Sequence, residues 1–72
     1  MSKTEKTLNK LTEQQEKTLA LFKTFLAFEK NKGKMDECAK IKHRTDGYLM
    51  ALVDLNLITD SERRLLYTWV TL

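Results

Sequence analysis

The sequence lacks the residues for the disulfides and zinc sites that usually stabilise a small protein. Of its 72 residues only Cys38 is a cysteine, so an intramolecular disulfide cannot form. One cysteine and one histidine also do not provide the ligand set of a structural zinc site. A chain of this length buries only about 60% of the surface that its unfolded form exposes. We therefore expect it to gain stability from well-packed helices or from self-association.

Proline is absent, and the two glycines stand at positions 33 and 47, which favours long helices. The longest apolar run, residues 48–53, is far shorter than the roughly 20 residues that cross a bilayer. No apolar segment follows the polar residues after Met1, as a secretory signal would require. With a lone thiol and no such signal, we expect a cytoplasmic protein that does not engage a membrane.

The apolar spacing predicts a first helix at about residues 3–32. Ser2 and Glu5 fit a capping box at its start, and Gly33 suits the left-handed residue that ends a helix. The apolar stripe is thin before residue 18. It widens from Leu19 to Phe28 until it covers most of the helix circumference.

A second helix is predicted at about residues 34–56, with Gly47 in its middle. Either another backbone approaches this glycine closely, or the helix breaks there. Because the apolar phase persists across it, we expect a continuous or merely kinked helix. Asn56 suits a left-handed end, and Thr59 with Glu62 forms the pattern of a capping box that opens a third helix at about 60–71.

These segments predict an all-α fold in a single domain over residues 1–72: a long antiparallel helical hairpin plus a short third helix, a three-helix arrangement. We expect Trp69 to pack in the core and the C-terminus to be docked. Helices of such unequal length cannot cover the broad apolar stretch of the first helix, and an uncovered apolar patch indicates a partner surface. We therefore predict a homodimer, and a protein interface formed by Leu21, Phe22, Phe25 and Phe28.

The reactive side chains do not form a recognisable catalytic pattern. Cys38 and His43 are five residues apart and lie on different faces of a helix, so they are not expected to meet. The carboxylates at 36, 37, 46 and 54 follow the spacing of a solvated helix face. Phosphate-binding glycine loops and paired-cysteine motifs are absent. The sequence predicts no enzyme, with no catalytic residue, cofactor, metal site or small-molecule substrate.

Positive charge is concentrated in the first half of the chain, where residues 1–34 carry eight lysines against four glutamates. The net charge of +3 alone is too small to indicate a nucleic-acid binder. Reading of a major groove by the third helix is disfavoured, because its first turn carries Asp60 and Glu62. A concentration of cations can still contact phosphates. The residues that would do so are Lys30, Lys32, Lys34, Lys40, Lys42 and Arg44.

Two functions therefore remain open. The leading hypothesis is a small helical interaction module or regulator that binds itself and an unidentified protein, a role compatible with a phage or plasmid origin. The alternative is a nucleic-acid-binding regulator that uses the basic Lys30–Arg44 end of the hairpin.

Overall fold

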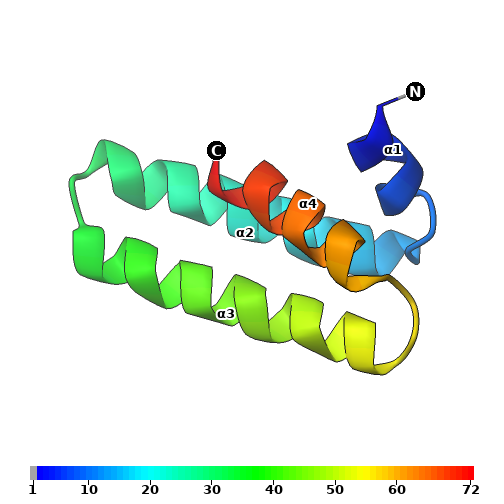
Figure 1. Ribbon diagram of the computed structural model, residues 1–72. Helices are drawn as coiled ribbons and strands as arrows, with labels where there is room; N and C mark the ends of the chain where they lie inside the picture. The colour runs from blue at the N-terminus through cyan, green and yellow to red at the C-terminus, as the bar shows by residue number, and fades with distance from the viewer. Residues whose placement is uncertain (1) are drawn as a thin grey trace.

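The computed structural model describes residues 2–72, which form four helices and no strand. The helices are α1 (Lys3–Leu8), α2 (Glu13–Asn31), α3 (Met35–Asp54) and α4 (Asp60–Thr71). α2 and α3 form an antiparallel hairpin, α4 packs against both, and α1 packs against α4 (Figure 1). The all-α prediction is confirmed, whereas the hairpin with one short helix is confirmed only in part, because the chain has a further helix at its start.

The prediction of one helix at about 3–32 is wrong, because the chain turns between α1 and α2. The Leu11 backbone N–H donates to the Leu8 carbonyl, and Thr12 then begins a new helix. The Gln15 N–H donates to the Thr12 hydroxyl at 3.1 Å, and the Thr12 N–H donates to the Gln15 side chain at 2.9 Å. This is a complete capping box, which stabilises a helix start there. The turn lets Leu8 and Leu11 bury themselves in the core.

Both turns that follow the long helices are closed by a residue in the left-handed region. Gly33 has φ of +70° and Asn56 has φ of +61°. After α3 the Leu57 N–H donates to the Leu52 carbonyl. The Asn56 N–H donates to the Val53 carbonyl, which completes a Schellman motif. The predicted roles of Gly33 and Asn56 as helix ends are therefore confirmed.

α3 runs without interruption through Gly47, as the apolar phase predicts. A Cβ built on Gly47 would have no atom of another element within 4 Å. Close backbone approach therefore does not explain this glycine. The predicted start of α4 is also confirmed, since Thr59 and Glu62 exchange both hydrogen bonds of a capping box.

One apolar cluster joins all four helices. Its fully buried members come from α2, α3 and α4, and α1 with its following turn closes one end. The cluster comprises Leu8, Leu11, Leu19, Leu49, Leu52, Ile58, Leu66 and Val70. Trp69 is partly buried and packs against this cluster, in line with its predicted place in the core. Leu19 anchors the inner face of α2 in this cluster, and the outer face is left to solvent.

Two lysines of α2 bind the C-terminal end of α4. The ammonium of Lys23 donates to the Trp69 carbonyl at 2.5 Å and lies 5.1 Å from the centre of the Trp69 ring. The ammonium of Lys30 donates to the Thr71 carbonyl at 2.9 Å. Cations at this end complement the helix dipole and satisfy carbonyls that have no partner within the helix. α4 is docked as predicted, although the side chain of Leu72 is exposed.

Candidate functional site

Three large apolar side chains are exposed along the outer face of α2. Leu21, Phe25 and Phe28 keep 51%, 51% and 55% of their surface accessible. Their spacing of four and three residues places them on one side of the helix, opposite the buried Leu19 and Leu26. We call these three residues the α2 stripe. No described element covers it.

The structure separates Phe22 from the other residues of the predicted interface. Phe22 is half-buried and packs against the core cluster. Its ring meets that of Tyr48 edge-on, with ring centres 5.9 Å apart and planes at 78°. Edge-to-face pairs of this kind stabilise the packing of two helices. Phe22 therefore joins α2 to α3. Of the four predicted interface residues, the three that are exposed form the α2 stripe.

A lysine lies at each end of the α2 stripe. The ammonium of Lys32 lies 4.1 Å from the centre of the Phe28 ring, which is a cation–π contact. Lys17 stands four residues before Leu21 and pairs with Glu13 at 3.2 Å. Both members of that pair are mostly exposed, so the pair contributes little to stability. The stripe is an apolar surface bounded by positive charge.

The predicted nucleic-acid residues do not form one uniform surface. Lys30 binds the end of α4, and Lys32 lies on Phe28. Lys40 pairs with Glu37 of its own helix at 3.4 Å. Lys42 lines a shallow cleft between α3 and α4 together with Asp46 and Tyr67. Lys34 and Arg44 are exposed. Several of these cations thus already have partners within the chain.

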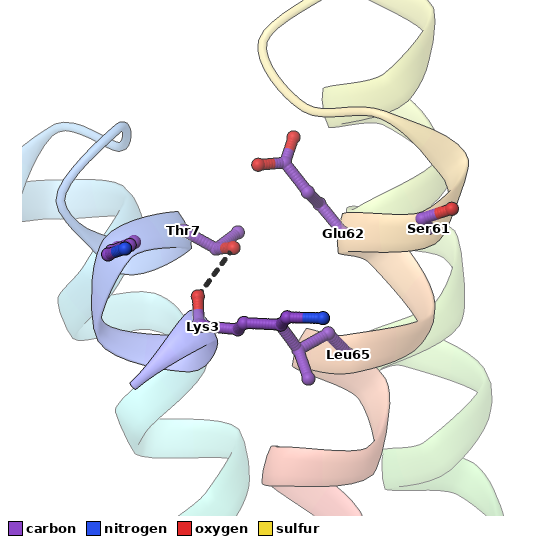
Figure 2. A pocket seen from close by; sticks show the side chains of 6 residues that line it. Lys3, Thr7, Ser61, Glu62 and Leu65 are labelled. Atoms are coloured by element: carbon purple, nitrogen blue, oxygen red, sulfur yellow. Dashed lines mark hydrogen bonds between the residues drawn. The ribbon is translucent and has the colours of Figure 1, made fainter. Parts of the chain in front are cut away.

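A further cleft lies between α1 and α4 (Figure 2). The Lys3 side chain extends from α1 towards α4 beside Leu65, and the Thr7 hydroxyl donates to the Lys3 carbonyl at 2.9 Å. Glu62 also lines the cleft, but Lys10 binds both of its carboxylate oxygens, at 2.7 and 2.9 Å. That contact, followed by the hydrogen bond from the Thr59 backbone, lowers the pKa of Glu62 below its usual 4.5. Glu62 therefore joins the turn that follows α1 to the first turn of α4.

The remaining reactive side chains are dispersed. Cys38 is buried, whereas His43, five residues on, is exposed on another side of α3. Among residues 2–72 no three His, Cys, Asp or Glu side chains come together as metal ligands would. None of the described helices has the length and apolar character needed to cross a membrane.

Comparison with protein-family models, with curated proteins and with solved structures gave no match. The sequence predicted all three residues of the α2 stripe as interface residues. It did not predict that Lys23 and Lys30 bind the C-terminal end of α4. Their signal was weak, since a lysine facing a distant helix end leaves no local pattern.

Proposed function

We propose that this protein is a small helical interaction module, a regulator that acts by binding a protein partner through the α2 stripe. The observation that carries the proposal is the exposure of Leu21, Phe25 and Phe28 together on one helix face. Single exposed apolar residues are common on proteins, but three aligned large ones are typical of an interaction surface. The proposal assigns no catalytic role to the chain.

The way in which α2 is held supports this role. Leu19 and Leu26 anchor the inner face of α2 in buried packing, and Lys23 ties it to α4. The stripe is thus presented on a helix whose backbone is already ordered. Binding to such a surface has a smaller entropic cost than binding to a flexible segment. Amphipathic helices that present apolar anchors at i, i+4 and i+7 recur in protein recognition.

Affinity capture from the native host lysate tests the proposal. The bait carries Phe25→Asp, and Met50→Asp is the matched control, since Met50 is another exposed apolar residue but lies on α3. We expect Phe25→Asp to lose the captured protein and Met50→Asp to keep it, with both variants as helical as the parent by circular dichroism. Equal capture by both variants would refute a role for the stripe.

Self-association through the α2 stripe stays a prediction. The simplest form is a twofold pair in which the two α2 helices meet. Sedimentation of the parent chain and of Phe25→Asp over a range of concentrations tests it. If the homodimer forms, it will appear as weak, reversible dimerisation in the parent that is lost in the variant. A parent chain that stays monomeric at high concentration would exclude the homodimer, and the capture experiment would still decide the binding of another protein.

Binding of nucleic acid through the basic end of the hairpin is the second candidate. The exposure of Lys34 and Arg44 favours it, whereas the internal partners of Lys30 and Lys40 count against it. Phosphate contacts would make binding fall steeply with salt. Nuclease treatment of the lysate before capture separates this candidate from the leading one, because only a nucleic-acid-mediated partner would then be lost.

A further inference from the structure

We infer that the partner that covers the α2 stripe is an acidic amphipathic helix, with apolar anchors on one face and a carboxylate at each end of that face. The inference rests on the proposed function and specifies its ligand. The observation that supports it is the lysine at each end of the stripe, Lys17 and Lys32.

The outer face of α2 carries a lysine at each end of the stripe. Lys17 precedes Leu21 by one turn, and Lys32 follows Phe28 by one turn. Within residues 17–32 the single carboxylate is Glu29. Glu29 follows Phe28 directly, which places it about 100° further around the helix, and it is half-buried with one carboxylate oxygen enclosed. A partner with carboxylates opposite Lys17 and Lys32 matches this face, and at Lys17 its carboxylate would replace Glu13, whose exposed ion pair is weak.

A second copy of the chain matches it poorly. In an antiparallel pair of α2 helices centred near Phe25, Lys17 of each copy would face Lys32 of the other. In a parallel pair each lysine would face its own equivalent. Either arrangement brings two lysines together at each end of the interface, and the carboxylate nearest to Lys17, Glu13, belongs to the same chain as that lysine. Like charges that face each other across an interface weaken it.

The area of the stripe limits how tightly a second copy could bind. With about half of each side chain accessible, the three residues expose roughly 300 Å², since one aromatic side chain buries about 150–250 Å². Stable protein pairs bury about 800 Å² on each partner. The stripe alone is therefore too small for a tight homodimer, and a helix laid along it would bind only weakly without the added ion pairs.

The spacing of the lysines sets the geometry of the partner. Lys17 and Lys32 are fifteen positions apart in the sequence, which corresponds to about 22 Å along a helix. A helical ligand would present apolar side chains at i, i+4 and i+7. It would carry one acidic residue four positions before the first anchor and another four positions after the last. A ligand of this kind needs about 20 residues, long enough to be helical by itself.

Two designed peptides test the inference against the full-length chain. Both are alanine-rich fluorescent helices of about 20 residues with leucines at the anchor positions. One carries glutamates at the two flanking positions, and the other carries lysines there. In fluorescence anisotropy we expect the glutamate peptide to bind roughly 2- to 30-fold more tightly, the range that two exposed ion pairs produce. Added salt should reduce the difference.

Variants of the chain separate charge from apolar contact. The double variant Lys17→Glu with Lys32→Glu should reverse the preference, so that the lysine peptide binds more tightly. Phe25→Asp should abolish binding of both peptides, and Met50→Asp should leave it unchanged. Circular dichroism of each variant verifies that the fold is intact.

Every result decides the inference. Preference for the glutamate peptide, reversed by the double variant, supports it. Equal binding of the two peptides, or preference for the lysine peptide, overturns the charge requirement but leaves the α2 stripe as a binding surface. If neither peptide binds, or if the chain forms a dimer that the peptides do not displace, a helical acidic ligand is excluded. The capture experiment then decides the proposed function independently.

Discussion

Replacement of Gly47 by alanine should stabilise the protein. Gly47 is exposed in the middle of α3, where glycine costs about 1 kcal/mol relative to alanine. The added methyl group would meet no atom of another element within 4 Å, so no steric cost opposes the gain. We therefore expect the free energy of unfolding to rise by about 1 kcal/mol, with a rise of roughly 4–8 °C in the melting temperature for a domain of this size.

Gly33→Ala provides the matched control with the opposite sign. A Cβ at Gly33 would also have nothing within 4 Å, so the two substitutions differ only in backbone conformation. Gly33 has φ of +70°, a conformation that costs an alanine about 1–2 kcal/mol. This variant should lose stability by about that amount.

Urea unfolding followed by far-ultraviolet circular dichroism measures both changes, with the slope of the transition checked for constancy. An increase for Gly47→Ala with a decrease for Gly33→Ala is the expected pair of results. If Gly47→Ala lowers the midpoint or leaves it unchanged, the description of α3 as a continuous, unobstructed helix at this position is refuted.

Three further predictions concern stability. Thr59→Ala removes the hydroxyl of the α4 capping box and should lower the free energy of unfolding, measured in urea, by about 1 kcal/mol. Thr59→Ser keeps the hydroxyl and should keep most of that stability. Leu66→Ala deletes a fully buried side chain and should cost about 2–5 kcal/mol, measured in the same way; a loss below 1 kcal/mol, the scale of a single capping contact, would contradict the core described for α4. The pKa of Glu62 is lowered in the folded state, chiefly by its hydrogen bond from Lys10. The ionised carboxylate therefore adds to the free energy of unfolding above pH 4.5, and this stabilisation is lost as the pH falls through the lower folded-state pKa. Glu62→Gln should therefore flatten the loss of stability on acidification, and an unchanged pH profile would contradict the role of this contact.

Local signals in the sequence were sufficient where a helix end depends on one or two residues. The left-handed turns at Gly33 and Asn56 and the capping box at Thr59 follow from the conformations that those side chains allow. The continuity of α3 followed from the unbroken apolar phase across Gly47. Each of these features is encoded within a few neighbouring residues, which is why a single sequence predicts it.

The division of the first predicted helix was missed for a different reason. The pattern Thr12–Gln15 carries a capping-box signal, but the apolar spacing remains helical across it. Tertiary packing decided the outcome, since the turn buries Leu8 and Leu11 against the core. The separation of Phe22 from the α2 stripe likewise depends on its contact with Tyr48 of α3. No local pattern contains that contact.

Site-specific photocrosslinking tests the central claim, that the α2 stripe is the binding surface, most directly. A benzoylphenylalanine placed at Phe25 or at Met50 of the full chain is irradiated in host cells, and covalent adducts are resolved by mass. We predict that the probe at Phe25 forms an adduct with one protein partner and that the probe at Met50 does not. Adducts of equal yield from both positions, or from Met50 alone, would contradict the claim.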